Sequence, residues 1–293
     1  MNKTAMLVQH VKYFPVFFMP LEEPRSGSYR ESALSKERCQ TLGTAHGKLA
    51  TKLPDESQLE AASRDLGKIV LPILQRLTVV EGAPATLDLV RWACQFYSYS
   101  VLAHFREMLR SFLVLTWNGL IPASFVTARC LFEIAAHAHY AHKHVTQYLD
   151  SNDLESAQRF LTDINMGSRY MQEEYGEKTE EWPPFAAPRE IAKVIRTFDE
   201  WTKRKARTEY SFLSEFAHPN MAAFSHYYKI ELGEAGFGVV TFFEPRRDPD
   251  AAPWPQVSIS FIASLHFVCR LLRRVDEKEV APHVETVLGK FAK

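Results

Sequence analysis

The sequence is poor in glycine, and its charge shows no excess of either sign. Only 12 of the 293 residues are glycine and 46% are hydrophobic, which excludes a flexible scaffold and supplies enough apolar material for a substantial core. Lysine plus arginine and aspartate plus glutamate number 35 each. A broad nucleic-acid or membrane surface driven by charge alone is therefore not expected.

Cysteine is also scarce. Cys39, Cys94, Cys130 and Cys269 lie far apart, and no Cys-x-x-Cys pair is present, so the common zinc and redox motifs are excluded. Three of the four lie in apolar stretches with helical spacing. We interpret them as small buried side chains in a reducing compartment.

The first residues lack an apolar run long enough for a signal peptide or a membrane span, since His10, Lys12 and Pro15 interrupt it. We therefore expect a cytoplasmic protein with no membrane partner. The segment Thr4–Met19 is rich in valine, phenylalanine and tyrosine, which predicts one strand or two short ones.

Apolar residues at helical spacing dominate the rest of the chain. One predicted helix contains Pro72, which should kink or interrupt it. Two long predicted helices are joined through Gly119 and Pro122, and because this connection is short the two helices must run antiparallel. The predicted helices cover Gln58–Leu77, Ala85–Asn118, Ile121–Leu149, a stretch from Ser151 or Asp153 to about Gly176, Pro188–His218 and Val257–Val275, with a shorter helix after Pro282.

Two β-rich runs flank Gly233 and Gly236 and predict a hairpin within residues 224–243. The fold class expected is therefore mainly α, an antiparallel helical bundle with a small β element formed by the N-terminal strand and this hairpin. We divide the chain into an N-terminal strand and linker segment, residues 1–56, and the bundle with its inserted hairpin, residues 57–293. Together they are expected to form one compact domain.

The helix predicted over Ile121–Leu149 is apolar on nearly every side, yet it carries Arg129 and Glu133. Such a helix belongs in a core, where unpaired charged side chains almost never occur. We predict that these two residues pair with each other or with His218. Together with His137 they lie four residues apart along one face of the helix. A structural ion pair and a ligand-binding or catalytic site are both open interpretations.

A second polar stripe is formed by Tyr210, Ser214 and His218, again spaced four apart, and Pro219 ends their helix. The negative end of the helix dipole at His218 favours a cation there. A serine in the middle of a helix has no free backbone amides for an oxyanion hole, so Ser214 is not expected to be a hydrolase nucleophile.

Histidines 137, 139, 142 and 144 crowd one end of the Arg129 helix. Glu133, His137 and His144 share a face, as metal ligands in a bundle would, but the Glu-x-x-His spacing of di-iron bundles is absent and the other two histidines point elsewhere. We expect exposed or core-packed histidines, and no metal or cofactor.

Two motifs carry a resemblance to known proteins. An Ala-Arg-x-Leu-Phe-Glu helix and a later Tyr-x-x-Leu-Ser-x-x-x-His-Pro segment resemble a group of uncharacterised bacterial all-helical proteins, over roughly residues 90–220. The matching residues are Ala128, Arg129, Leu131, Phe132, Glu133, Tyr148, Leu149, Tyr210, Leu213, Ser214, His218 and Pro219.

That group is similar in turn to HEPN helical bundles, many of which are ribonucleases or nucleotide-binding modules of defence and toxin systems. The resemblance implies a bundle in which Arg129, Glu133 and His218 meet. HEPN nucleases place an arginine and a histidine closer together than Arg129 and His137 lie here, which argues against nuclease activity.

Two functional hypotheses follow. The first is a ligand- or partner-binding module that uses Arg129, Glu133, His137, Tyr210, Ser214 and His218, with a nucleotide or RNA as a possible ligand. The alternative is a metal-independent ribonuclease or toxin effector, in which Arg129 stabilises a phosphate and His218 acts as acid or base, with Glu133 as a further catalytic candidate. A homo-oligomer is compatible with either hypothesis.

Overall fold

The structure is a computed structural model that describes residues 54–74, 86–166, 190–203, 206–218, 228–232, 238–242, 249–278 and 280–291, and the statements below concern these residues. The described part is mainly helical, as predicted, and its helices belong to one compact unit within residues 36–293. The N-terminal strand expected within Thr4–Met19 lies outside the described residues.

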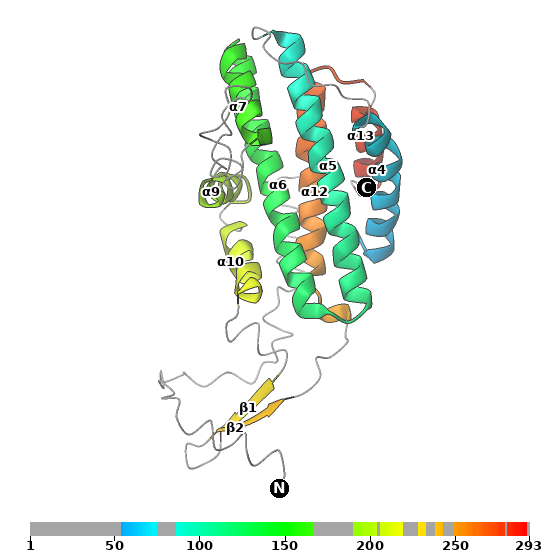
Figure 1. The fold of residues 1–293 in the computed structure, drawn as a ribbon, viewed down its shortest axis with the longest axis vertical. Coiled ribbons are helices and arrows are strands. Elements are labelled where there is room, and N and C mark those ends of the chain that lie inside the picture. Colours follow the sequence, from blue (N-terminus) through cyan, green and yellow to red (C-terminus); the bar gives the residue numbers. More distant parts are fainter. Residues whose placement is uncertain are drawn as a thin grey trace, which may run out of the picture. The chain divides into compact units, whose positions relative to one another are not determined.

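An antiparallel hairpin of two long helices forms the centre of the bundle (Figure 1). Helix α5 covers Leu87–Trp117 and begins at Thr86, whose hydroxyl accepts a hydrogen bond from the Leu89 amide at 3.2 Å. Gly119 adopts the predicted left-handed conformation, with φ 71°. Helix α6, Ile121–Asp150, then begins with Pro122 in its first turn. Both helices and their connection are confirmed.

Helix α12, Trp254–Arg274, packs along both α5 and α6 and completes the core (Figure 1). The rings of Phe105 and Phe261 meet at 5.9 Å between α5 and α12. By length and composition α12 could cross a membrane, but 83% of its most apolar window is buried inside the protein. Such burial is typical of a core helix.

Three shorter helices cover the outer side of α6: α7, Leu154–Met166; α9, Ile191–Trp201; and α10, Ala206–Ala217 (Figure 1). The single helix predicted over residues 188–218 is wrong, because the chain breaks between α9 and α10. The Thr202 hydroxyl donates to the Phe198 carbonyl at 3.1 Å and accepts from the Ala206 amide at 3.0 Å. Lys203 adopts a positive φ of 54°. Thr202 therefore closes one helix and caps the next.

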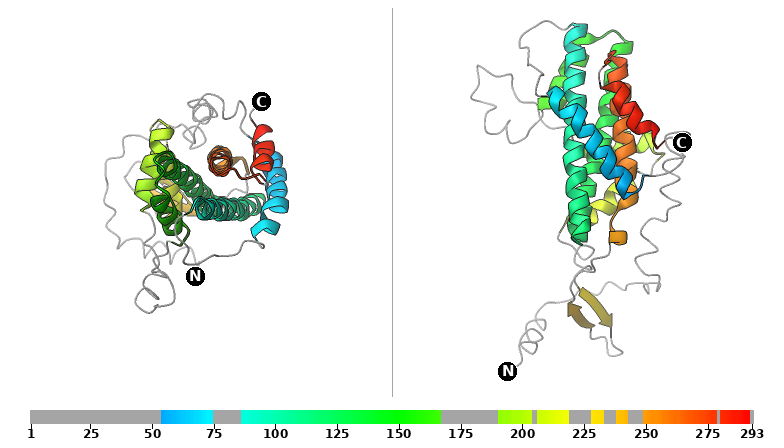
Figure 2. Two further views of the ribbon diagram at one scale, coloured as in Figure 1. Left: turned by 90° about the horizontal axis from the view of Figure 1, so that it is seen from above. Right: turned by 90° about the vertical axis from the view of Figure 1, so that its right-hand side faces the viewer.

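Helices α4, Glu56–Leu74, and α13, Ala281–Gly289, lie on the opposite side of the bundle, next to each other (Figure 2). Of the two predicted effects of Pro72, a kink or an interruption, the interruption is wrong, because α4 continues through Pro72 to Leu74. The buried Glu277 carboxylate accepts hydrogen bonds from the amides of Val280 and Ala281 at 2.7–2.9 Å, which caps α13 with a negative charge.

Strands β1, Tyr228–Leu232, and β2, Gly238–Phe242, pair antiparallel, with Tyr228 opposite Phe242. They fall in the segment where the sequence predicts a hairpin. The N-terminal strand expected beside them lies outside the described residues, so the complete β element stays a prediction.

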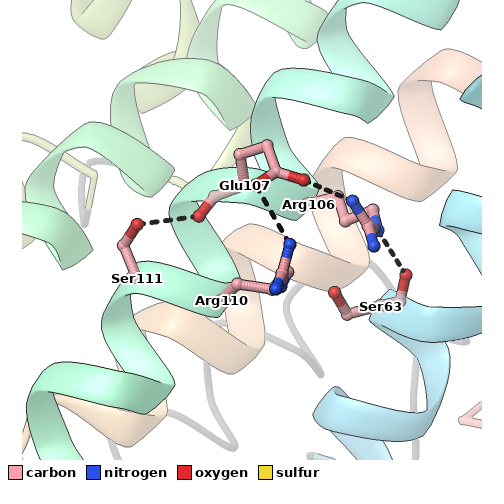
Figure 3. A network of polar contacts seen from close by, with 5 residues as sticks. All are labelled: Ser63, Arg106, Glu107, Arg110 and Ser111. Carbon is pink, nitrogen blue, oxygen red and sulfur yellow. Dashed lines mark hydrogen bonds and ion pairs between the residues drawn. The ribbon is translucent and has the colours of Figure 1, made fainter.

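Arg106 of α5 joins α4 to the central hairpin (Figure 3). Its Nε donates to the Ser63 carbonyl at 3.1 Å, and its guanidinium forms an ion pair with Glu107. Gly67 makes this close approach possible, since a Cβ on Gly67 would lie 2.2 Å from Arg106 Nε. A glycine in the middle of a helix is thus required by packing, not by a turn.

We expect Gly67→Ala to lower the free energy of unfolding by about 1–2 kcal/mol, because Arg106 must move and lose the Ser63 carbonyl. In an Arg106→Ala background the same change should instead stabilise the protein by up to about 1 kcal/mol through helix propensity. Urea unfolding of the four proteins measures both effects. An equal loss in the two backgrounds would contradict the proposed clash.

Candidate functional site

Arg129 of α6 contacts both Glu133 of its own helix and Tyr210 of α10. Arg129 Nε donates to Glu133 Oε1 at 2.9 Å, and Arg129 Nη2 donates to Tyr210 Oη at 2.8 Å. The predicted ion pair is therefore confirmed. The two charged side chains are 24% and 29% exposed, so the pair lies at the edge of the core instead of being sealed inside it.

The three groups stabilise one another electrostatically. Burial works against the Arg129 charge, but hydrogen bonding to Tyr210 and the nearby Glu133 carboxylate leave its pKa above the ordinary value. Burial, and next the Glu133 charge, raises the pKa of the Tyr210 phenol. Arg129 thus stays charged and Tyr210 stays neutral, with the guanidinium carbon 5.1 Å from the Tyr210 ring centre.

The structure does not bring His218 into this cluster. Its side chain is exposed at the end of α10, and no hydrogen bond or ion pair connects it with Arg129 or Glu133. Ser214 donates its hydroxyl to the Tyr210 carbonyl of its own helix at 2.7 Å. The expected meeting of Arg129, Glu133 and His218 is therefore replaced by one of Arg129, Glu133 and Tyr210.

Beside the ion pair, a groove of about 410 Å³ opens between α5, α6 and α7. Glu133 and His137 belong to its wall, so two of the predicted site residues line it. The full lining is Tyr97, Ser100, Val101 and His104 from α5, Cys130, Glu133, Ile134 and His137 from α6, and Ile164 and Asn165 from α7.

Tyr97 is the feature of this groove that sequence reasoning missed. The residue is 5% exposed, and its hydroxyl has no hydrogen-bond partner within the described part of the chain. A buried hydroxyl normally has a partner, because leaving it without one costs about 1–3 kcal/mol. In the sequence Tyr97 looks like any other apolar residue of a core helix, so no signal distinguished it.

Three titratable groups of the groove wall are held in their neutral forms. Burial lowers the pKa of His137, although the Glu133 carboxylate acts in the opposite direction. Burial, and next the Glu133 charge, raises the pKa of the Cys130 thiol. Burial also raises the pKa of the Tyr97 phenol well above its ordinary value. At neutral pH these three residues therefore offer uncharged hydrogen-bonding groups.

Of the other histidines of α6, His139 packs in the core, which is one of the predicted alternatives, whereas His142 and His144 are half-buried. His139 is buried, with ring centres 4.6 Å from Phe267 and 5.7 Å from Phe198. His144 packs on Phe160 at 5.3 Å. The described residues contain no cluster of three or more His, Cys, Asp or Glu side chains placed to hold a metal ion.

Comparison of the chain with protein-family models, with curated proteins and with solved structures finds no match. Function is therefore inferred from the geometry of the groove and of the ion pair.

We expect Arg129→Gln to lower the free energy of unfolding by about 1–3 kcal/mol, between the values typical of exposed and buried pairs. Tyr210→Phe should cost about 1 kcal/mol. Because both changes break the same network, the double variant should lose less than the sum. Chemical denaturation measures this cycle. The matched control is Arg196→Gln on the exposed surface of α9, which should change the free energy of unfolding by less than about 0.5 kcal/mol. Strictly additive losses in Arg129→Gln and Tyr210→Phe would contradict the network.

His142 makes stability depend on pH. Burial, followed by the charges of Arg270 and Arg274, lowers its pKa from 6.5 to about 4. The unfolded chain therefore binds this proton first as the pH falls, so stability is full above about 6.5 and decreases down to about 4. We expect His142→Gln to remove on the order of 2 kcal/mol of that decrease. Thermal melts of both proteins from pH 7 to 4 check this; parallel curves would contradict it.

Proposed function

We propose that this chain is a ligand-binding helical module that takes a small molecule into the groove between α5, α6 and α7. The observation that carries the proposal concerns Tyr97, which lines the groove and whose buried hydroxyl has no hydrogen-bond partner among the described residues. A binding site accepts such a cost when a ligand supplies the missing hydrogen bond.

The dimensions and composition of the groove support this proposal. Its volume of about 410 Å³ falls within the usual range of small-molecule sites, about 300–1,000 Å³. Val101, Ile134 and Ile164 supply apolar surface, and Ser100 and Asn165 add polar groups. A mainly apolar cleft with a few convergent polar side chains is the common form of a small-molecule site.

The geometry gives the ribonuclease alternative less support. The Arg129 guanidinium is already bonded to Glu133 and Tyr210, and His218 is exposed on α10 without a bond to either charged residue. A phosphate-stabilising arginine and an acid–base histidine would have to converge on one reacting group. Cleavage of total RNA that is lost in both Arg129→Gln and His218→Ala would restore that alternative.

The resemblance to HEPN bundles remains part of the proposal. It is supported by the contact between two of the motifs, Arg129 and Glu133 on one helix and Tyr210 on another. The proposed cytoplasmic location is supported by the free thiols of Cys94, Cys130 and Cys269 among the described residues, as expected in a reducing compartment.

The proposal is tested by screening a fragment library by ligand-observed NMR and by measuring how each hit changes the alkylation of Cys130 by N-ethylmaleimide. Cys130 lines the groove and is partly exposed, whereas Cys94 and Cys269 are buried. Peptide mass spectrometry separates Cys130 from the other cysteines. Hits that occupy the groove should slow the alkylation of Cys130.

A groove-filling variant provides the control. Val101→Trp places an indole in the groove, and Val114→Trp makes the same change on the exposed surface of the same helix, where Val114 is 54% exposed. Binding should be lost in the first variant and kept in the second. If Val101→Trp does not fold, wild-type protein alkylated at Cys130 replaces it. Hits that bind all of these proteins equally well would contradict a site in the groove.

A further inference from the structure

We infer that the ligand of this groove is an uncharged, partly apolar molecule that carries both hydrogen-bond donors and acceptors, with the Tyr97 hydroxyl as its anchor. This inference rests on the proposed function and names its ligand class. It departs from the nucleotide or other anionic ligand expected from the sequence.

The described wall of the groove offers no free cationic group to an anionic ligand. None of the described residues that line the groove is a lysine or an arginine. The guanidinium of Arg129, which pairs with the groove residue Glu133, donates to Glu133 Oε1 and to Tyr210. Recognition of phosphate or carboxylate uses free cationic donors. An anion in this groove would instead approach the Glu133 carboxylate.

The backbone of the described groove wall supplies no anion site either. The lining residues of α5 lie between positions 97 and 104 of a helix that covers Leu87–Trp117, and those of α6 lie between 130 and 137 of Ile121–Asp150. Amides in the middle of a helix are bonded to carbonyls of the same helix. Neither helix presents a free N-terminus to the groove, so the usual backbone cradle for a phosphate is missing.

A cation is not favoured strongly. Glu133 is the one carboxylate in the described groove wall, and Arg129 already compensates its charge at 2.9 Å. Moving a cation out of water is costly unless a partner of opposite charge is available. A neutral ligand avoids that cost and can still use the acceptor capacity of Glu133.

The remaining groups suit such a ligand. The Tyr97 hydroxyl can donate one hydrogen bond and accept others, the Asn165 amide does both, and neutral His137 has one donor and one acceptor nitrogen. Because the Tyr97 oxygen itself is shielded from solvent, a ligand reaches it only when the groove wall moves. The apolar side chains beside these groups complement the apolar part of the ligand.

A series of three probes with one shape tests the inference: benzamide, which is neutral; benzoate, an anion; and benzamidine, a cation. Affinity is measured by NMR titration and by the slowing of Cys130 alkylation. We expect benzamide to bind at least about tenfold more tightly than either charged probe. Tighter binding by benzoate or benzamidine would overturn the inference while leaving the proposed binding function intact.

Tyr97→Phe removes only the anchoring hydroxyl. We expect it to weaken benzamide binding about fivefold to tenfold, while the melting temperature of the free protein stays the same or rises, because an unpaired buried hydroxyl is lost. Ser98→Ala is the matched control, since Ser98 on the same helix is also a buried hydroxyl without a partner in the described part of the chain but does not line the groove.

Ser98→Ala should leave benzamide binding unchanged. A lower melting temperature of Tyr97→Phe, with unchanged affinity, would mean that the hydroxyl is structural and would overturn its role as anchor. Failure of all three probes to slow Cys130 alkylation would also overturn the inferred ligand class. The proposed function would then be judged by the fragment library and the groove-filling variant, and it fails if no fragment protects Cys130 or if the hits bind that variant equally well.

Discussion

The burial of α6 is the constraint on which the rest of the structure depends. This helix contacts α5, α7, α9, α10 and α12, so nearly every side of it must be apolar or paired. The charges of Arg129 and Glu133 on this helix are compensated by hydrogen bonds. Arg129 donates to Glu133 of the same helix and to Tyr210 of α10. The pair therefore fixes where α10 packs, and it also leaves one carboxylate at the edge of the neighbouring groove.

Local signals in the sequence predicted the centre of this fold. Gly119, Pro122 and the long apolar stretches on both sides of them specify an antiparallel helical hairpin through backbone conformation alone. The Arg129–Glu133 pair was one of two pairings expected by similar reasoning, since a nearly apolar helix leaves its charges to pair with each other or with a polar group of another helix. These predictions needed no knowledge of which helices pack together.

Other features depend on tertiary contacts that no local pattern encodes. The break between α9 and α10 is made by the Thr202 side chain, a residue type that also occurs inside helices, and by the positive φ of Lys203. His218 was expected near Arg129 and Glu133 because the resemblance implies that the three residues meet, and because the charges of an apolar helix need a polar partner. Once the chain turns at Thr202, Tyr210 meets Arg129 and His218 is left exposed. Tyr97 was missed because a missing hydrogen-bond partner is visible only in three dimensions.

Glu133 and Tyr97 have different physical roles in the groove. Glu133 serves both the ion pair and the groove wall, so replacing it disturbs folding and binding together and cannot separate them. Tyr97 contributes its ring to the packing of α5, while its hydroxyl has no partner in the described part of the fold. A group that costs stability in the free protein and lines a groove is more informative about a ligand than a charge that the fold already uses. For that reason the strongest functional signal of this chain comes from an uncharged residue, although its sequence first draws attention to its charges.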